Sequence, residues 1–393
     1  MLLRPSSNAS PRKQWLPRRR HLFYLLLVFV GLLFVGVVLR YRPSTVPQFV
    51  DLLRLPSTVY IPNISCDRCN HFDMRCISEP MINCSVIDDS NESGIFLMIL
   101  VMSAVDNFER RRAIRRTWGG TTTHRRHRVR TYFMCGRSST DSTAADVVRL
   151  RKEIADFGDV VQLDIVDSYT WLTNKTVAAL RWATKRRCPD VQFILKTDDD
   201  SFNVPGRFID RLVDVDHLTT GNSRPFVGGQ CSSGDEPVRA VGKKWFVSEL
   251  SYPGWYYPLH AKGRAYLLSS LAARLIVEAS ANVVFNAMED VFVTGLCRVR
   301  VGIACTNVAG IRRDNEAITD CDVATSSVYN VHYVTDDVKM DRLWNVVLNG
   351  SAECLSTVRS GATTDLSTCC SIVFVRLLVL LPLFDFICCS RYH

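Results

Sequence analysis

Three consecutive carboxylates, Asp198, Asp199 and Asp200, follow a short apolar run, Phe193 to Leu195, that ends in Lys-Thr. Such a run is typical of a buried strand, so the carboxylates stand at the end of that strand. Three carboxylates this close repel one another, and their desolvation is costly. A divalent cation removes this conflict, because hard carboxylate oxygens suit Mg²⁺ or Mn²⁺, which also bind phosphate oxygens. The triplet therefore predicts a metal site; a solvated acidic turn is the alternative.

A basic segment, 109–116, lies just after an apolar run at 95–101. Arg111 and Arg115 are four residues apart, so they share a face if the segment is helical. Two guanidinium groups on one face suit a diphosphate, and a solvated basic helix is the alternative. We add Lys196, which directly precedes the acidic triplet, as a third candidate for contact with a phosphate-bearing donor.

An aromatic-rich segment from Lys244 to Ser269 supplies candidates for sugar binding, because aromatic faces are suited to stacking on sugar rings. Ordinary core and loop aromatics are the alternative. The candidate sugar or acceptor contacts are Trp245, Tyr257, Gly263 and Tyr266.

A further acidic pair, Glu289 and Asp290, enters an apolar run. Such a pair caps a helix N-terminus or supplies a carboxylate to a buried site. We keep both interpretations open at this point.

Alternating strand and helix patterns surround these residues and must position them. The sequence predicts strands at 95–101, 130–135, 160–166 and 193–197, and helices at 146–157 and 175–187, the latter with Thr173 as its N-cap. This alternation indicates an α/β domain with a mostly parallel sheet, flanked by helices, that binds ligands at the carboxyl ends of its strands. The acidic triplet stands at such an end.

The N-terminal region predicts a membrane anchor. Residues 22–39 are uninterrupted apolar sequence of near-spanning length, behind a basic tail at 1–21. Because positive charge stays cytosolic, we expect one transmembrane helix with the rest of the chain luminal. A cleaved signal peptide is the alternative, but the apolar run is too long for one and no small-x-small cleavage site follows it.

The remaining regions follow from composition. Residues 40–93 are rich in Pro, Ser, Asn and Cys and predict a luminal stem, 94–350 predict the catalytic domain, and 351–393 form a tail of unknown role with an apolar stretch at 371–389. Residues 1–42 hold eight basic residues and no acid, so the rest of the chain, whose whole has net charge +9, is close to neutral. The charge therefore reflects membrane topology and gives no reason to expect nucleic-acid binding.

Fifteen cysteines and several glycosylation sequons fit an oxidising secretory compartment. The predicted luminal glycosylation sites are Asn63, Asn83, Asn91, Asn174 and Asn349. A cysteine cluster precedes the main domain at Cys66, Cys69, Cys76 and Cys84. We favour disulfides there over a zinc site, and spacing does not define the pairing.

Taken in order, these segments resemble the β-1,3-galactosyltransferase and β-1,3-N-acetylglucosaminyltransferase family over roughly residues 94–350. The resemblance rests on the 109–119 segment, Lys196 to Asp200, 244–269 and 289–295, and on the stretch 167–176, which looks like the family's D-S-Y-x-N-L-T-x-K-T. A Pro-x-Arg element, Pro237 to Arg239, adds to it.

The resemblance implies a type II Golgi membrane enzyme with the nucleotide-sugar transferase fold called GT-A, a UDP-sugar donor and a divalent metal, usually Mn²⁺. It implies inversion to a β-1,3 bond, with UDP-galactose favoured over UDP-N-acetylglucosamine and a glycan of a glycoprotein or glycolipid as acceptor. We expect Asp200 and Asp198 to hold the metal with His332 as a second type of ligand. Asp290 is the expected base, and Glu289 is the fallback.

The sequence departs from the family at a few positions. Ala265 replaces glycine in the Gly-x-Gly-Tyr element, Trp171 stands where Asn is usual, and Asn203 and Val204 exchange order. A non-catalytic membrane chaperone or assembly partner on the same scaffold therefore remains an alternative. A metal-dependent phosphohydrolase is a further alternative, because the acidic triplet also suits that class of enzyme.

Overall fold

The computed structural model describes residues 64–72, 75–80, 94–138, 143–187, 191–214, 224–312, 317–325, 327–350 and 354. The expected cytosolic tail, membrane anchor and most of the stem and C-terminal tail lie outside the described residues. Within the described part of the chain, no helix is both long enough and apolar enough to cross a membrane.

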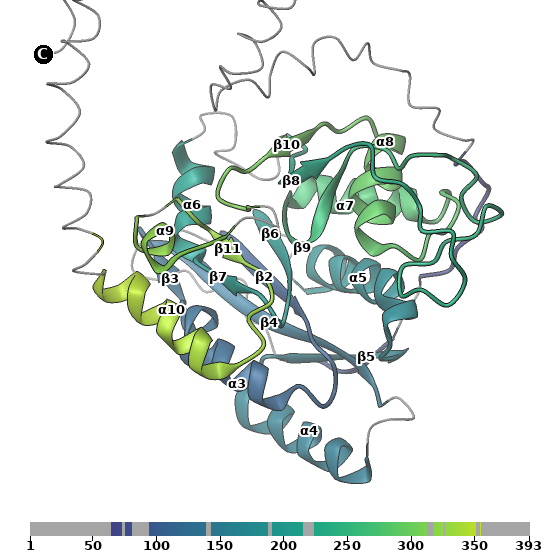
Figure 1. The fold of residues 1–393 in the computed structure, drawn as a ribbon. Helices are drawn as coiled ribbons and strands as arrows, with labels where there is room; N and C mark the ends of the chain where they lie inside the picture. Colours follow the sequence, from purple (N-terminus) through teal and green to yellow (C-terminus); the bar gives the residue numbers. More distant parts are fainter. Residues whose placement is uncertain are drawn as a thin grey trace, which may run out of the picture. The chain divides into compact units, whose positions relative to one another are not determined.

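Nine strands of the described residues form one mixed sheet (Figure 1). Its strands are β1 (Cys76–Ser78), β2 (Leu97–Met102), β3 (Thr123–His124), β4 (His127–Arg137), β5 (Val160–Val166), β6 (Phe193–Asp198), β8 (Val227–Ser232), β9 (His260–Ser269) and β10 (Cys305–Asn307). The main path runs in the order β1-β5-β4-β2-β6-β9-β8-β10, and β3 pairs with β4.

The prediction of a mostly parallel sheet requires correction. Strands β5, β4, β2 and β6 are parallel, as expected from the strand and helix alternation. However, β9 lies antiparallel to both β6 and β8. The aromatic-rich strand β9 was not separately predicted, and its reversed direction brings its N-terminal end beside the carboxyl end of β6.

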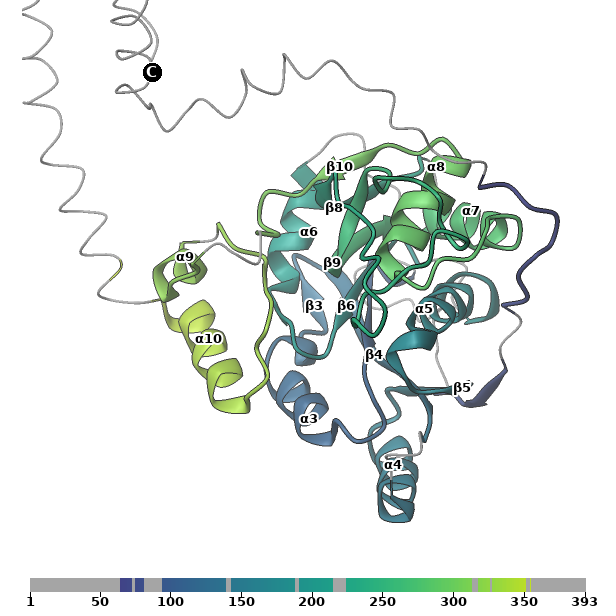
Figure 2. The same ribbon diagram turned by 45° about the vertical axis from the view of Figure 1, so that its right-hand side comes forward.

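Strand β2 shows why the sheet is buried on both faces. Alternate side chains of a strand point to opposite faces. Met98 and Leu100 join a core with helices α5 (Leu172–Arg181) and α7 (Ser270–Ser280), whereas Leu97 and Ile99 join a second core. The helices that contribute to this second core are α3 (Phe108–Arg116), α4 (Ala144–Phe157), α6 (Pro205–Asp214) and α10 (Asp337–Asn349). Figure 2 shows α10 beside α3.

Most predicted elements agree closely with the structure, but one cap does not. Helix α4 starts at a capping box of Thr143 and Asp146, and β5 has the predicted bounds. Helix α5 begins earlier than predicted and continues into the π-helical turn Trp182–Arg187. Thr173 is not its N-cap, because the helix begins at Leu172 and Trp171 is the N-cap. The Thr173 hydroxyl instead donates to the carbonyls of residues 286 and 287, 3.1 and 3.0 Å away. This contact ties α5 to the segment that precedes the acidic pair.

A small second sheet links the end of the domain to the acidic triplet. Strand β7 (Phe202–Asn203) pairs antiparallel with β11 (Asn330–Val331). Within it, the buried Asn330 amide donates to Asn203 Oδ1 at 2.9 Å. The backbone N–H of Val334 also donates to the Asp200 carbonyl at 2.8 Å. His332 is therefore held beside residues far from it in the sequence.

The shorter helices complete the described elements. They are η1 (Trp118–Gly120), η2 (Tyr169–Trp171), the π-helix η4 (Val291–Cys297), α8 (Arg298–Arg300) and α9 (Asp320–Ala324).

Disulfides join Cys66 to Cys69, Cys231 to Cys305 and Cys321 to Cys354. The first pair favours the disulfide interpretation of the N-terminal cluster, whose Cys84 lies outside the described residues. Of the sequons, Asn174 is half-buried on α5 and Asn349 is exposed at the end of α10. Asn63, Asn83 and Asn91 lie outside the described residues.

The predicted diphosphate contacts on α3 require correction. Arg111 is fully buried and donates to Glu153 through Nε and Nη2, at 2.9 and 2.8 Å. Arg115 donates to Glu153 and to both oxygens of Asp159, each at 2.7 Å. The two arginines do share a face, but α4 and the turn before β5 supply the carboxylates that neutralise them. Their guanidinium groups fasten α3 to α4 and do not face a cavity.

We expect Glu153→Ala to destabilise the fold by about 3–5 kcal/mol, since it leaves the buried guanidinium of Arg111 without its counter-charge and removes one of the two carboxylates that pair with Arg115. Urea unfolding of the purified protein measures this change. Glu109→Ala is the matched control, because Glu109 is exposed and pairs with Arg149 on the surface, and its loss costs about 1 kcal/mol or less. Equal effects of the two substitutions would contradict the structural role of Glu153.

Candidate functional site

A cavity of about 470 Å³ opens where β6 ends and β9 begins. Segments from five parts of the chain line it, among them the loop between β8 and β9, the start of η4 and the residues after β11. Its wall includes Tyr169, Lys196, Asp198, Asp200, Trp245, Tyr257, Gly263, Glu289, Asp290 and His332. The cavity thus gathers most of the residues that the sequence singled out.

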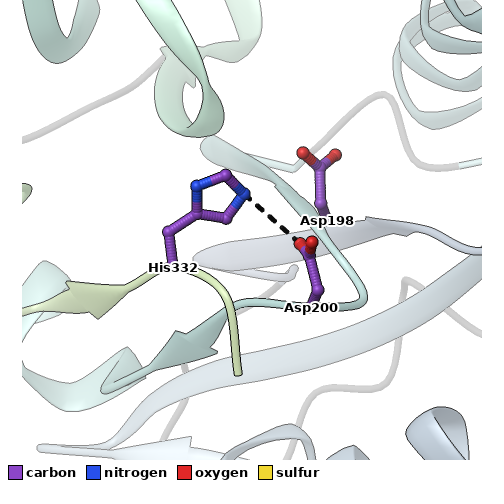
Figure 3. Close-up of side chains that lie close together, drawn as sticks. All are labelled: Asp198, Asp200 and His332. Carbon is purple, nitrogen blue, oxygen red and sulfur yellow. Dashed lines mark ion pairs between the residues drawn. The ribbon is translucent and has the colours of Figure 1, made fainter. Parts of the chain in front are cut away.

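Asp198, Asp200 and His332 form a candidate metal centre. One ligand atom from each lies within 4.8 Å of the others, and Nε2 of His332 is 3.5 Å from Oδ1 of Asp200. Figure 3 shows the imidazole facing the Asp200 carboxylate, with Asp198 nearby at the end of β6. Oδ1 of Asp200 is buried and makes no hydrogen bond of good geometry. Carboxylate oxygens and an imidazole nitrogen in this arrangement suit Mn²⁺ or Mg²⁺.

Opposing effects set the charge of these carboxylates. Burial alone raises the pKa of Asp200, but His332 and Arg110 outweigh it and hold that pKa below its usual range. Burial raises the pKa of Asp198, although the ammonium of Lys196 counters this shift. A cation bound between these side chains would favour the ionised form of both carboxylates.

Asp199 is not part of the metal centre, contrary to the expectation from the triplet. Its side chain accepts hydrogen bonds from Asn107 at 2.8 Å and from Arg110 at 3.0 Å, both at the start of α3. Asp199 and Asp200 lie in the turn after β6, and there the middle residue of the triplet turns away from its neighbours.

Lys196 connects the two acidic regions of the cavity. Its ammonium is fully buried and lies 2.7 Å from Asp198 Oδ1, 2.7 Å from the Gly263 carbonyl and 3.2 Å from Glu289 Oε2. Burial acts to lower the pKa of Lys196, but the two carboxylates raise it overall. The three donor positions of the ammonium are occupied by protein groups, so Lys196 does not serve as the predicted donor contact and instead fixes the carboxylates.

Glu289 is the buried member of the second acidic pair. It is 4% exposed, and its Oε1 accepts a hydrogen bond from the hydroxyl of Tyr266 at 2.6 Å. Burial raises the pKa of Glu289 to about 7, against the opposing charge of Lys196. Tyr266 lies opposite Lys196 across the β6–β9 ladder. It holds the Glu289 carboxylate through its hydroxyl and does not itself line the cavity.

Asp290 is half-buried and faces the cavity. Its Oδ2 accepts from the Gly263 backbone N–H at 3.0 Å and its Oδ1 from the Val291 N–H at 2.9 Å. Both interpretations of the acidic pair hold here, because Asp290 caps η4 and also presents a carboxylate to the cavity. A Cβ at Gly263 would lie 3.5 Å from Asp290 Oδ2, so glycine at this position keeps space beside the carboxylate.

An aromatic wall completes the cavity. Trp245 is half exposed and Tyr257 is buried, and both line the cavity as expected. Tyr169 also lines it, with the Lys244 ammonium 4.7 Å from the centre of its ring, and burial raises its pKa to about 12. Tyr169 was not selected from the sequence, although the D-S-Y element that contains it was a usable signal.

The substituted glycine position does not intrude on the cavity. Ala265 is fully buried and belongs to the core that includes α3 and α6, on the face of β9 away from Tyr266. Its methyl group therefore does not block ligand access. Asn203, which has exchanged places with Val204 relative to the family, supports β11 through its hydrogen bond with Asn330.

Comparison with known proteins shows consistent similarities. A family model described as Galactosyltransferase matches residues 109–309, just over half of the chain. Beta-1,3-galactosyltransferase 5 of Pan paniscus is 34% identical over 220 residues, which cover 55% of this chain and 68% of that protein. Beta-1,3-galactosyltransferase 1 of Mus musculus is 31% identical over 250 residues, 64% of this chain and 73% of that protein.

A relative whose name gives a different sugar is also similar. Acetylgalactosaminyl-O-glycosyl-glycoprotein beta-1,3-N-acetylglucosaminyltransferase of Mus musculus is 35% identical over 228 residues, which cover 56% of this chain and 55% of that protein.

We expect Asp200→Asn to weaken Mn²⁺ binding at least tenfold, since it removes a charged ligand, whereas Asp199→Asn leaves Mn²⁺ binding within about twofold of the wild type. Calorimetric titration of Mn²⁺ into each variant in the presence of UDP measures the difference. The reverse order of effects would show that the middle carboxylate of the triplet is the ligand.

The raised pKa of Glu289 predicts a pH dependence of stability. A carboxyl that holds its proton more tightly in the folded state stabilises that state at low pH, and this contribution is lost as the pH rises through about 7. In metal-free protein, the free energy of unfolding of the wild type should therefore fall relative to Glu289→Gln between about pH 4.5 and pH 7.5. Urea unfolding across this range measures the difference, with the exposed Glu249→Gln as control. Parallel pH profiles for wild type and Glu289→Gln would contradict the shift.

Proposed function

Since the chain belongs to the galactosyltransferase family, we propose that it is a UDP-sugar-dependent β-1,3-glycosyltransferase. It transfers a hexose to the 3-hydroxyl of an acceptor glycan and inverts the configuration at the anomeric carbon. Galactose is the proposed sugar, because most of the similar relatives carry that sugar in their names. N-acetylglucosamine is the alternative, in line with the relative of that activity.

One observation carries this proposal. The candidate metal centre and the Asp290 carboxylate line a single cavity, and the buried Lys196 bridges Asp198 to Glu289, the neighbour of Asp290. Transfer from a sugar nucleotide needs a cation at the diphosphate and a base at the acceptor hydroxyl. This cavity contains ligands for a cation and a carboxylate that can act as the base. The aromatic wall at Trp245 and Tyr257 provides faces for sugar rings.

The residues fit a divalent cation, Mn²⁺ or Mg²⁺, held by Asp198, Asp200 and His332. When bound, such an ion supplies charge that stabilises the departing UDP. Lys196 keeps the carboxylate of Asp198 oriented toward this centre.

Asp290 is the proposed base. It takes the proton from the acceptor hydroxyl as that oxygen bonds to the anomeric carbon and the bond to UDP breaks. The backbone N–H of Gly263 holds the carboxylate in place from one side. Glu289 is buried and committed to Tyr266 and Lys196, so it orients the site and is not the fallback base.

Two observations weigh against the other candidate functions. A non-catalytic scaffold protein has no need of a buried Lys196 between two carboxylates. Ala265, the substituted glycine position that supported this alternative, lies outside the cavity. A phosphohydrolase of the two-metal type needs a second set of ligands, and the described residues contain one such group.

We place the enzyme in the Golgi membrane as a single-pass type II protein with a luminal catalytic domain. The basic tail at 1–21 and the apolar run at 22–39 support this orientation. The disulfides Cys231–Cys305 and Cys321–Cys354 fit an oxidising lumen. The acceptor is a glycan carried by a glycoprotein or a glycolipid.

The proposal is tested by UDP release from the full-length protein in detergent, offered a panel of UDP-sugars and simple galactoside, N-acetylgalactosaminide or other acceptors, with Mn²⁺ or with EDTA. We expect acceptor-dependent, EDTA-sensitive release from UDP-galactose. Asp290→Asn should lower kcat by about 10²–10⁴-fold with little change in the Kd for UDP, because the lost carboxylate acts on the acceptor proton. Folded wild type that fails to bind UDP in Mn²⁺ would refute the assignment.

A further inference from the structure

Exposed apolar side chains gather on the long connection between β8 and β9. Single exposed apolar residues are normal on a protein surface, whereas a cluster of them indicates a contact surface. Among the described residues, the three most exposed large apolar side chains are Leu250 at 96%, Val241 at 85% and Trp255 at 83%. The exposed apolar members of this connection are Val241, Trp245, Phe246, Leu250, Trp255, Tyr256 and Leu259, which we refer to as the apolar rim.

The fold holds this connection in place and leaves its apolar rim outside. The guanidinium of Arg239 donates to the carbonyls of Val247, Tyr252 and Gly254, at 2.9, 2.7 and 2.9 Å. The side chains of Val247 and Tyr252 are buried and join the core that includes α5 and α7. Because the connection already fills its part of the core with these side chains, the apolar rim points away from the domain.

Exposed aromatic side chains continue onto η2, which follows β5. The Lys244 ammonium lies 4.7 Å from the centre of the Tyr169 ring, so η2 lies beside the β8–β9 connection. Trp171, at the other end of η2, is 45% exposed and stands where the family usually has Asn. Trp171 and Phe72 line one cavity, so the described end of the stem lies next to η2. The apolar rim, η2 and the stem therefore occupy neighbouring parts of the surface.

The residue types of this surface favour a lipid interface. Tryptophan and tyrosine combine an apolar ring with a polar atom and are enriched at membrane–water interfaces. Leucine and valine supply apolar area for the acyl boundary, and the exposed Lys243 and Lys244 suit phospholipid phosphates. Glu249 is the one acidic residue between Pro237 and Leu259, against three basic residues, so the charge of this connection does not oppose contact with phospholipid.

The proposed topology keeps a bilayer close to this surface. The predicted anchor ends at residue 39, and the described chain begins at Ile64. The segment that follows packs beside the end of α7, where the Cys66 N–H donates to the Asn282 carbonyl at 3.1 Å. A linker of about two dozen residues spans at most about 80 Å, and about 30 Å as a flexible coil. Tethering at such a distance raises the effective concentration of the membrane, an advantage that a soluble partner lacks.

We propose that the apolar rim rests on the surface of a phospholipid bilayer, with Leu250 and Trp255 at the boundary between the headgroups and the acyl chains. The inference rests on the proposed function, because that function places the chain on a membrane anchor. Trp245 belongs to the apolar rim and also lines the large cavity. Docking therefore brings the cavity to the membrane and favours an acceptor glycan that is carried by a lipid.

The first test measures contact with lipid and does not depend on turnover. The full-length protein is reconstituted into phosphatidylcholine vesicles with or without bromine on the acyl chains, because bromine quenches nearby tryptophan. The fluorescence of the wild type minus that of Trp255→Phe gives the contribution of Trp255. This contribution should fall about twofold or more in brominated vesicles, because the ring lies at the acyl boundary. Trp344→Phe, on α10, is the matched control, and the contribution of Trp344 should not change.

Two results of this test overturn the proposal. One is an equal contribution of Trp255 in the two kinds of vesicle. The other is a Trp255 that neither brominated lipid nor iodide in the buffer quenches, because protein then covers it, either a second copy or another part of this chain.

The second test asks whether docking serves the reaction. The variant Leu250→Ser with Trp255→Ser changes two residues of the apolar rim that do not line the large cavity. One acceptor sugar is offered both as a glycolipid in vesicles and as a soluble glycoside. For this variant, kcat/KM should fall about fivefold or more with the glycolipid and stay within about twofold of the wild type with the soluble form. Val148→Ser with Val338→Ser, exposed on α4 and α10, is the matched control and should change neither value.

Equal effects of the rim variant on the two acceptors overturn the preference for a lipid-borne acceptor. A wild type whose Trp255 is quenched by brominated lipid, but which transfers no sugar to either acceptor, refutes the proposed function instead and leaves the membrane contact standing.

Discussion

The ammonium of Lys196 is the interaction on which the site depends. It is fully buried, and it bridges Asp198 at the strand end to Glu289 on a segment some ninety positions further along the chain. Removing carboxylates from water is costly unless a cation compensates them, and a buried lysine keeps its charge only among such carboxylates. The two acidic regions and the lysine therefore stabilise one another.

Long-range contacts place the other groups around this centre. The reversed strand β9 brings Gly263 beside β6, and the hydroxyl of Thr173 holds the segment that leads to the acidic pair. The β7–β11 pair carries His332 to Asp200. Each of these contacts joins a helix or strand to a segment that lines the cavity, so the geometry of the site follows from the fold.

Two pairs of basic residues show that the same spacing leads to different contacts. Arg111 and Arg115 have the spacing of a phosphate site, yet buried Glu153 makes them a structural clamp between helices. Lys339 and Arg342 have a similar spacing on α10 but line a cavity beside the metal centre. The difference lies in burial. Glu153 forms a buried ion pair with Arg111, whereas the pair of Arg342 with Asp320 is exposed to solvent.

The sequence by itself determined the chemistry of the site and the parallel half of the sheet. The apolar runs defined β2 and β6, because a strand buried on both faces leaves a continuous apolar signal, whereas one face of β5 is partly exposed. The clustered acids predicted the candidate metal centre and the proposed base, because such charge is unfavourable without a role. Tertiary structure alone decided that Asp199 turns away, that Lys196 is enclosed by protein groups and that Thr173 is no cap. These outcomes depend on side-chain direction and on partners far away in the chain, and local sequence carries no record of either.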